Sequence, residues 1–266
     1  MILIRGAGDI ASGIAVRLYR CGFTLAMTDL NKPTSIRRTV CFSEAIIHGA
    51  CTVEDITAER AVSLDDAKAI WRRGHIPVFA DDGGTALSLL RPDAVVDARL
   101  AKVNLDTTLT DAPIVVTVGP GFTAGQDCHA VVETQRGHYL GRVIYEGAAA
   151  PNTGEPGNIG GYTVERIIRA PKAGVFHPVH QIGDQVAANE LVAYVDEAPV
   201  RCRIGGTLRG ILPEGVPIFK GMKSGDVDPR CKPEHCLCAS DKALSVGGGV
   251  LEALLHFGYS DKSYPA

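Results

Sequence analysis

The first half of the chain alternates short apolar runs with stretches whose apolar residues recur at helical spacing. The apolar runs predict strands, and the stretches between them predict amphipathic helices. Because strands that alternate with helices are typical of a parallel sheet covered on both faces, we predict an α/β fold with a Rossmann-like, doubly wound parallel sheet. The predicted strands cover 2–5, 24–28, 51–54, 76–80, 94–98 and 114–118, and the predicted helices lie near 9–21, 43–48, 65–73 and 84–90.

The pattern changes in the second half of the chain. Residues 128–134 and 139–145 flank a short polar turn and predict a hairpin. A Gly/Pro-rich stretch, 147–161, then marks a domain boundary. Beyond it, short β-type runs broken by glycine replace the helical periodicity. We therefore expect a nucleotide-fold domain over 1–163, a small all-β domain over 164–230, and a C-terminal segment, 231–266, whose helix packs on the first domain.

The turn between the first strand and the first helix carries the strongest chemical signal. Gly6-x-Gly8-x-x-Ala11 fits a nucleotide-binding fingerprint, in which the first glycine permits a tight turn and the second lets a phosphate approach the backbone. The helix N-terminus that follows favours an anion. Asp29 closes the next apolar run, about twenty residues on, where a ribose-binding carboxylate is expected. We predict that Gly6, Gly8 and Asp9 surround phosphates and that Asp29 meets a ribose-like hydroxyl.

Two further features are expected at the same edge of the sheet. Gly119 and Gly121 follow the predicted strand 114–118 and would form a second ligand-binding loop, although an ordinary tight turn explains them equally well. The pair Asp81-Asp82 ends another strand and could bind a sugar hydroxyl or a metal. We favour a helix cap for this pair.

Composition and charge narrow the functional classes. The 266 residues carry a net charge of −3 with no basic run, which disfavours a nucleic-acid surface. No apolar stretch is long enough to span a bilayer, and Met1 leads directly into a strand rather than a signal-peptide pattern. We predict a cytoplasmic protein with no nucleic-acid or membrane partner, in which the eight cysteines stay mostly reduced.

The last part of the chain holds a cysteine cluster. Cys231, Cys236 and Cys238 are spaced as Cys-x4-Cys-x-Cys, which matches no common zinc pattern, so we predict no metal site. Cys236 and Cys238 precede Ser240, which is expected to cap the final helix; a thiol near that helix start would have a lowered pKa and could be reactive. Ordinary loop cysteines are the alternative. The sequence identifies no nucleophile or general base, so no catalytic residue is assigned.

The all-β part also carries recognisable motifs. It contains Ala170-Pro171-x-x-Gly174 and Gly183-Asp184-x-Val186, followed by the apolar run that ends at Asp196. This order resembles the biotinyl/lipoyl-type barrel-sandwich domain. Carrier domains of that type present a lysine on a hairpin, and residues 194–200 contain none. We predict a barrel-sandwich domain without a covalent prosthetic group.

Further motifs extend over nearly the whole chain. They are Ile4–Gly13, Cys41–Ala45, Val116–Phe122, Arg136–Arg142, Pro151–Pro156, Lys223–Arg230 and Ser240–Ala243. Together they resemble the YqeB-type proteins of selenium-dependent molybdenum hydroxylase systems. The N-terminal part is also similar to the nucleotide-fold domain of XdhC-type accessory factors, which mature xanthine dehydrogenase. The resemblance implies a process and assigns no reaction.

We therefore expect an accessory factor in the maturation of a selenium-dependent, xanthine dehydrogenase-like molybdenum hydroxylase, which would be its partner. Its ligand would carry a nucleotide or phosphate, with NAD(P) and molybdopterin dinucleotide as candidate cofactors. Two alternatives stay open: an NAD(P)-dependent oxidoreductase, and a non-catalytic scaffold with a vestigial nucleotide site. The sequence leaves the oligomeric state open, a homodimer included, and does not decide whether the protein is an enzyme.

Overall fold

The computed structural model describes residues 1–260 and divides into two compact units. The first comprises Met1–Pro33, Cys41–Thr153 and the chain from Ala239 onward. The second comprises Thr34–Val40 and Gly154–Cys238. The main division therefore falls within the Gly/Pro-rich stretch 147–161.

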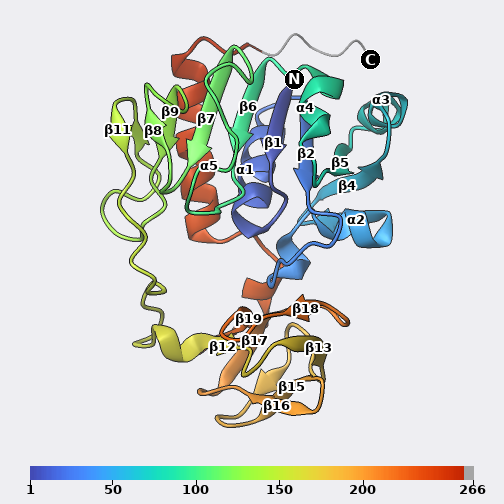
Figure 1. Ribbon diagram of the computed structural model, residues 1–266, viewed down its shortest axis with the longest axis vertical. Helices are drawn as coiled ribbons and strands as arrows, with labels where there is room; N and C mark the ends of the chain where they lie inside the picture. Colours follow the sequence, from blue (N-terminus) through green and yellow to red (C-terminus); the bar gives the residue numbers. More distant parts are fainter. Residues whose placement is uncertain (261–266) are drawn as a thin grey trace. The chain divides into compact units, whose positions relative to one another are not determined.

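A nine-stranded sheet forms the centre of the first unit (Figure 1). Its strands are β1 (Ile2–Arg5), β2 (Leu25–Asp29), β3 (Ala50–Val53), β4 (Ile56–Ala61), β5 (Ile76–Ala80), β6 (Ala94–Asp97), β7 (Ile114–Val118), β9 (Ala130–Val132) and β10 (Val143–Ile144). Their order across the sheet is β10-β9-β7-β6-β1-β2-β5-β4-β3. Neighbouring strands run parallel except in the two edge pairs, β3–β4 and β9–β10. The expected α/β fold with a large, mostly parallel sheet is confirmed, as is the hairpin of β9 with β10.

The order of the strands reverses beside β1. The strands β2 to β5 all lie on one side of β1. After β5 the chain crosses back, and β6 pairs with β1 on its other side. In parallel α/β sheets, ligands bind outside the carboxyl ends of the strands at such a reversal. The carboxyl ends of β1 and β6 therefore locate the part of the first unit best suited to hold a ligand.

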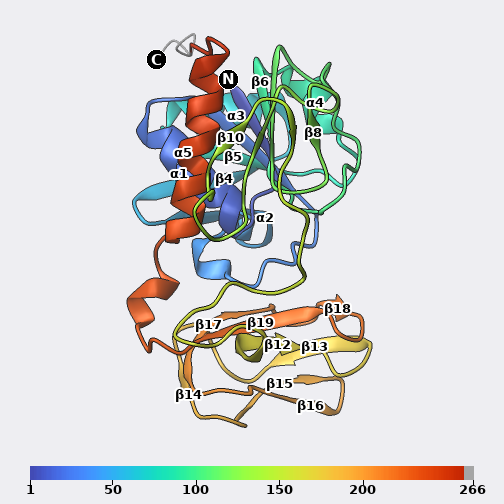
Figure 2. The same cartoon turned by 90° about the vertical axis from the view of Figure 1, so that its left-hand side faces the viewer.

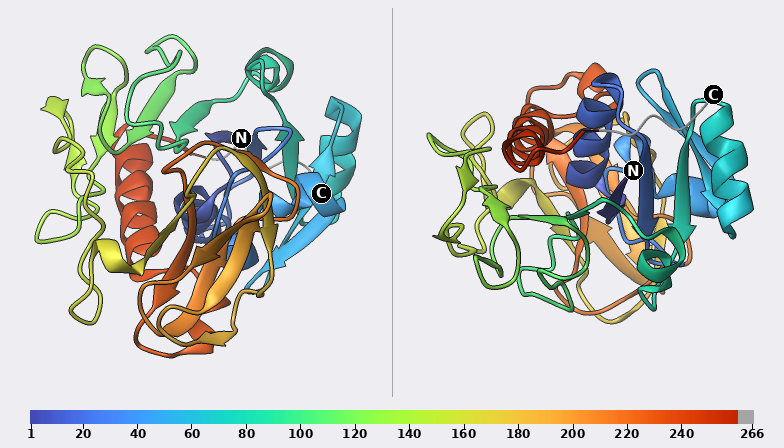
Figure 3. Two further views of the ribbon diagram at one scale, coloured as in Figure 1. Left: turned by 60° about the horizontal axis from the view of Figure 1, so that its bottom comes forward. Right: turned by 90° about the horizontal axis from the view of Figure 1, so that it is seen from above.

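Helices cover both faces of this sheet. α1 (Asp9–Arg20) and α5 (Asp241–His256) pack side by side on one face, as Figures 2 and 3 show. α3 (Leu64–Arg72) and α4 (Thr85–Leu90) contribute to the apolar cluster on the opposite face, and the short α2 (Glu44–His48) packs against β3 and β4. β8 (Thr123–Ala124) and β11 (Gly147–Ala148) form a separate two-stranded sheet. Within residues 1–260, none of the helices is long and apolar enough to cross a bilayer.

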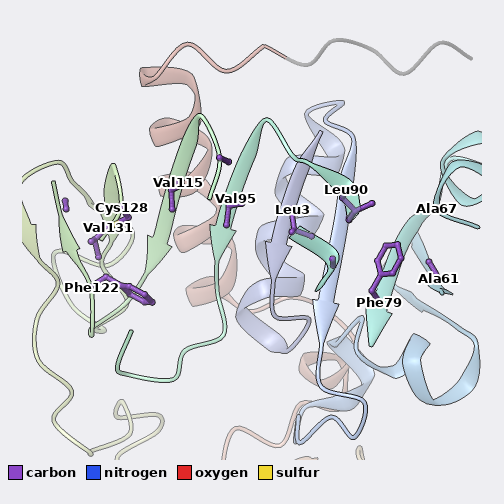
Figure 4. Close-up of a cluster of buried hydrophobic side chains, with 14 of the residues drawn as sticks. Leu3, Ala61, Ala67, Phe79, Leu90, Val95, Val115, Phe122, Cys128 and Val131 are labelled. Atoms are coloured by element: carbon purple, nitrogen blue, oxygen red, sulfur yellow. The ribbon is translucent and has the colours of Figure 1, made fainter. Parts of the chain in front are cut away.

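Alternate residues of the strands bury their side chains in the cluster opposite α1 (Figure 4). Leu3, Val95 and Val115 come from the adjacent strands β1, β6 and β7. The chain connects β6 to β7 through an irregular segment, 98–113, instead of a crossover helix. This segment lies at the reversal and supplies most of the polar groups described below.

The second unit contains two four-stranded antiparallel sheets. The first, in the order β12-β19-β17-β14, consists of β12 (Ile167–Arg169), β19 (Lys223–Asp228), β17 (Gly206–Ile211) and β14 (Gln185–Val186). The second, in the order β16-β15-β13-β18, consists of β16 (Ala198–Arg201), β15 (Leu191–Val195), β13 (Gly174–Pro178) and β18 (Pro217–Ile218). Phe176 and Val195 of one sheet share an apolar cluster with Leu208 and Val227 of the other. The two sheets therefore pack face to face.

The described boundaries differ from the expected domains at 154–163, which belongs to the second unit, and at two shorter segments, 34–40 and 231–238. The backbone N–H of Ile211 donates to the Ile36 carbonyl at 2.8 Å, so segment 34–40, which contains the 3₁₀ turn η1 (Arg38–Val40), extends the edge of the second unit. Arg37 Nη2 in turn donates to the carbonyl of His235, at 3.0 Å, in the 3₁₀ turn η3 (Pro233–Cys236). Both segments join the second unit through contacts between residues distant in sequence, which local patterns do not reveal.

Candidate functional site

Gly6 and Ala98 follow the two strands that meet at the reversal of strand order. A Cβ atom added to Gly6 would lie 2.9 Å from the carbonyl oxygen of Ala98, and Gly6 has φ +105°. Both the close approach and the left-handed backbone therefore require glycine. The first glycine of the fingerprint permits the turn, as predicted, and also lets the turns after β1 and β6 touch.

Asp29 fastens the glycine turn to the end of β2. Its Oδ2 accepts the Ala7 N–H and its Oδ1 accepts the Leu30 N–H, both at 2.8 Å. Burial raises the pKa of Asp29, with a smaller contribution from the nearby charge of Asp82, while the two hydrogen bonds oppose the shift. The structure thus brings Asp29 to the turn, where its carboxylate supports the backbone.

The N-terminus of α1 opens directly above this turn. Gly8 is its N-cap residue with an extended backbone and, as a glycine, has no side chain to make a capping bond. Asp9 is the first residue of the helix. Ser12 steadies the turn, because its Oγ donates to the Ala7 carbonyl at 3.0 Å and accepts the Phe42 N–H at 2.8 Å. Sequence reasoning missed this role of Ser12.

The second glycine loop is explained by packing. Gly119 and Gly121 have φ of +80° and +108°. A Cβ atom at Gly121 would lie 2.7 Å from backbone atoms of Lys102 and Val103, and one at Gly119 would lie 2.9 Å from the hydroxyl of Thr134. These contacts agree with the tight-turn alternative for this loop.

Asp81 acts as the cap that we favoured from the sequence. Its carboxylate accepts the N–H groups of Thr85 and Ala86, at 2.7 and 2.9 Å, at the start of α4. Asp82 accepts the Asn31 N–H at 2.8 Å and so joins the end of β5 to the end of β2. Both carboxylates therefore have backbone partners.

A cluster of charged residues at the reversal was not anticipated from the sequence. Asp97, at the end of β6, is buried and holds the guanidinium of Arg99 through contacts of 2.6 to 3.2 Å. The Thr107 hydroxyl donates to Asp97 at 2.6 Å and accepts from Arg5 at 2.9 Å. Polar residues that directly follow apolar strands were the signal that could have identified this group, which we call the arginine cluster: Arg5, Asp97, Arg99, Asp106, Thr107 and Asp111.

Asp106 bridges the two arginines of this cluster. Its Oδ2 accepts from Arg5 Nη2 and its Oδ1 from Arg99 Nη2, both at 2.6 Å. Burial alone would raise the pKa of Asp106, but the hydrogen bonds from Arg99 and Arg5 outweigh it and lower the pKa. Asp106 is therefore ionised at neutral pH, and the bridge is a pair of charge-assisted hydrogen bonds.

An open groove of about 790 Å³ runs beside α4. Gly84 and Asp111 line it, and Asp111 also lies 3.5 Å from Arg5 Nη1, so the groove reaches the arginine cluster. Leu87, Pro92 and Ala112 supply apolar lining further along. Most of the groove is lined by α4 and by the residues that lead into β6 and β7, so it touches the arginine cluster at Asp111 and extends away from the reversal.

The cysteines of the second unit do not share one environment. Cys236 lies in η3 and is buried, and burial raises the pKa of its thiol, where the sequence predicted a lowered value. Cys238 is exposed, and its Sγ lies 3.5 Å from the Glu234 carbonyl. The expected cap is present, because Ser240 Oγ accepts the Ala243 N–H at 3.1 Å. Across residues 1–260, no group of three or more His, Cys, Asp or Glu side chains is placed to hold a metal ion.

Comparison with known proteins gives one strong sequence match, and no family model matches the chain. The chain is 49% identical over 255 residues to the Escherichia coli (strain K12) protein named uncharacterized protein YqeB. The chain is similar to YqeB. The match covers 96% of the chain and 47% of YqeB, so the chain spans about half the length of this relative.

Solved structures give only weak matches. An aspartoacylase family protein from Mesorhizobium loti is 13% identical with a TM-score of 0.27, over 85% of this chain and 83% of that one. The ectoine utilization protein EutE (DoeB) from Ruegeria pomeroyi is 11% identical with a TM-score of 0.24, over 76% and 57%. A succinylglutamate desuccinylase/aspartoacylase from Rhodobacter sphaeroides is 24% identical with a TM-score of 0.22, over 24% and 21%.

Proposed function

We propose that the protein is an accessory factor in the maturation of a selenium-dependent, xanthine dehydrogenase-like molybdenum hydroxylase in the cytoplasm. In this proposal the first unit is a Rossmann-like domain that binds a nucleotide-bearing or phosphate-bearing ligand, and molybdopterin dinucleotide is the leading candidate. The second unit is a barrel-sandwich domain that recognises the ligand or the hydroxylase. The motif resemblance to YqeB-type proteins and the 49% identity to YqeB support the assignment.

One observation carries the ligand-binding part of the proposal. The glycine turn stands at the reversal of strand order, and the N-cap residue of the helix that begins there is Gly8, which has no side chain to occupy the N-terminus. A helix N-terminus presents N–H donors and a partial positive charge, which favour a phosphate. Gly6, Gly8 and Asp9 would surround the phosphates. Asp29, whose oxygens each accept one backbone N–H, keeps lone pairs for a ribose-like hydroxyl.

Replacement of Gly8 tests this part directly. We expect Gly8→Val to abolish binding of molybdopterin dinucleotide in calorimetry, because the side chain would occupy the space of a phosphate. Gly248→Val is the matched control, since Gly248 lies in α5 with open space around it. Equal affinities of the Gly8 variant and the wild type would remove the turn from the site. NAD(H) binding in the same assay would favour the oxidoreductase alternative instead.

A second candidate, the non-catalytic scaffold, is favoured by two observations, one at each glycine loop. The Ala7 N–H in the glycine turn is already bonded to Asp29, and Gly121 packs against Lys102 and Val103. A turn with internal partners can be purely structural. Mass spectrometry of small molecules that stay bound to the purified protein distinguishes the two candidates. The scaffold candidate predicts that no small molecule is found.

A further inference from the structure

Arg5 and Arg99 share one carboxylate, and its two oxygens are divided between them. Asp106 Oδ2 lies 2.6 Å from Arg5 Nη2, and Asp106 Oδ1 lies 2.6 Å from Arg99 Nη2. Two guanidinium groups that converge on the oxygens of one anion form the arrangement by which arginines hold a phosphate or a carboxylate. Asp106 therefore occupies an anion-binding position of the protein itself.

We propose that this position binds an anionic group of the ligand, and that Asp106 is a latch that the ligand displaces. The inference rests on the proposed function, because it assigns the contact residues of a ligand at the reversal. The binding residues are Arg5 and Arg99. The ligand group is an oxyanion with a single negative charge, either a phosphate diester or a carboxylate.

Asp106 is the member of the arginine cluster that can leave at low cost. Its side chain is 52% exposed, whereas those of Arg5 and Arg99 are 9% and 23% exposed. Ion pairs with an exposed partner are worth little, since water solvates that partner once it is released. Displacement of Asp106 therefore returns a carboxylate to water, and the incoming anion takes its place as the partner of the two guanidinium groups.

Both arginines have other partners besides the latch. Asp97 holds Arg99 through two of its guanidinium nitrogens. Thr107 accepts from Arg5 at 2.9 Å, and Asp111 lies 3.5 Å from the same nitrogen of Arg5. The donors that would receive an anion are therefore preorganised, and preorganisation reduces the entropic cost of binding.

The balance of charge selects a singly charged group. The cluster holds two arginines and three aspartates, one negative charge in excess. An incoming group with one negative charge replaces Asp106 without changing this balance, whereas a terminal phosphate, with nearly two charges at neutral pH, would add to the excess. Each phosphate of a dinucleotide diphosphate carries one negative charge, as does a carboxylate.

The segment around Asp106 combines left-handed backbone with exposed apolar side chains. Leu100 and Lys102 adopt positive φ angles of 56° and 68°, and Val103 and Leu105 are exposed beside Asp106. Non-glycine residues in the left-handed region store strain, and such residues are frequent in ligand clamps. Release of 100–106 on displacement of Asp106 also requires loss of the Asn104 bond to Asp127 and of the packing of Lys102 and Val103 on Gly121, while Thr107 stays bonded to Asp97.

Asp106→Asn tests the latch in the full chain. Calorimetry would use NAD⁺ as the phosphate-diester probe and acetate as the carboxylate probe. The amide is neutral and competes poorly for the guanidinium groups, so we expect binding of one probe to tighten about tenfold. The probe that tightens identifies the ligand chemistry. Asp55→Asn is the matched control, because Asp55 is also an exposed carboxylate paired with an arginine, Arg20, and lies outside the groove, so both affinities should stay unchanged.

Hydrogen exchange of the wild type provides a second measurement that does not depend on a variant. The latch predicts faster exchange in 100–106 when the probe is bound, and slower exchange would overturn it. Unchanged or weaker binding by a folded Asp106→Asn protein would also overturn the latch while the proposed function stands. Failure of wild type and variant to bind either probe overturns the latch as well. The proposed function is judged separately by the comparison of Gly8→Val with wild type on molybdopterin dinucleotide.

Discussion

Asp228 is a buried carboxyl group whose pKa depends on its neighbour in sequence, Arg230, and on the more distant Arg209. It lies at the end of β19 with no exposed surface, and Arg230 binds both of its oxygens, at 2.6 and 2.9 Å. Burial alone would raise the pKa of Asp228, but the hydrogen bonds from Arg230, followed by the charge of Arg209, lower it to about 2. Asp228 is thus ionised over the whole ordinary pH range.

The direction of this shift predicts a pH dependence of stability. A carboxylate whose pKa is lower in the folded than in the unfolded state stabilises the fold fully above the unfolded pKa, about 3.9, and this contribution is lost as pH falls toward the folded value. We expect Asp228 to contribute on the order of 2 kcal/mol, lost between about pH 4 and pH 2. Denaturation of wild type and Asp228→Asn across this range checks it. The free energy of unfolding should depend less steeply on pH in the variant than in Asp65→Asn, an exposed control. Parallel pH curves for wild type and Asp228→Asn would contradict the prediction.

At the scale of a single element, tertiary packing in helix α5 outweighs the low helix propensity of its glycines. The sequence places three consecutive glycines, Gly247 to Gly249, in the middle of the predicted helix, and glycine is a poor helix former. The helix is nevertheless continuous from Asp241 to His256. Gly247 lies against the Gly13 carbonyl of α1, and a Cβ atom at Gly249 would lie 2.2 Å from the Gly141 carbonyl. Close backbone approach therefore explains two of the glycines.

Adjacent substitutions in this helix should have effects of opposite sign. Gly249→Ala should destabilise the protein by about 1–3 kcal/mol, because the added methyl group overlaps Gly141 and overpacking costs energy in this range. Gly248→Ala should stabilise it by about 0.5–1 kcal/mol, because a Cβ atom there meets open space and alanine favours the helix. Chemical denaturation measures both changes. Equal effects of the two substitutions would show that helix propensity, and not packing, governs this element.

Other elements differ from the sequence prediction where local pattern is weak. The strands 2–5 and 76–80 coincide with β1 and β5, since both are short apolar runs buried on two faces. β4 (Ile56–Ala61) was missed. Its central residues Glu59 and Arg60 are charged, and it forms because it pairs with β5 on one side and β3 on the other. Pairing partners, and not composition, therefore decide this strand.

At the scale of the whole molecule, the second unit departs from the carrier domains that its motifs resemble. At the turn between β15 and β16, Asp196 accepts the Val175 N–H at 2.9 Å and pairs with Lys172 at 2.9 Å. The hairpin tip therefore presents a carboxylate fixed to the neighbouring strand. The hairpin itself contributes no lysine, and Lys172, which lies outside the hairpin, is held in the ion pair with Asp196.

We therefore expect the purified protein to carry no covalent prosthetic group. Intact-mass spectrometry should give the mass calculated from the sequence, apart from loss of the initiator methionine. The same measurement on a lipoylated carrier domain expressed in the same host provides the positive control. A mass increment of biotin or lipoyl size on this protein would contradict the prediction and reopen a carrier function for the second unit.

The sequence by itself determined the features that depend on neighbouring residues. Apolar runs specify the buried strands, glycines specify the turn after β1, and Ser240 specifies the start of α5, because each is decided within a few residues of backbone. Only the tertiary structure decided which distant segments meet. Asp106 reaches Arg5 across a hundred residues of chain, and Ile36 pairs with Ile211 in the second unit. Such contacts depend on the order in which strands assemble, and that order is set by packing of the whole sheet rather than by any local pattern.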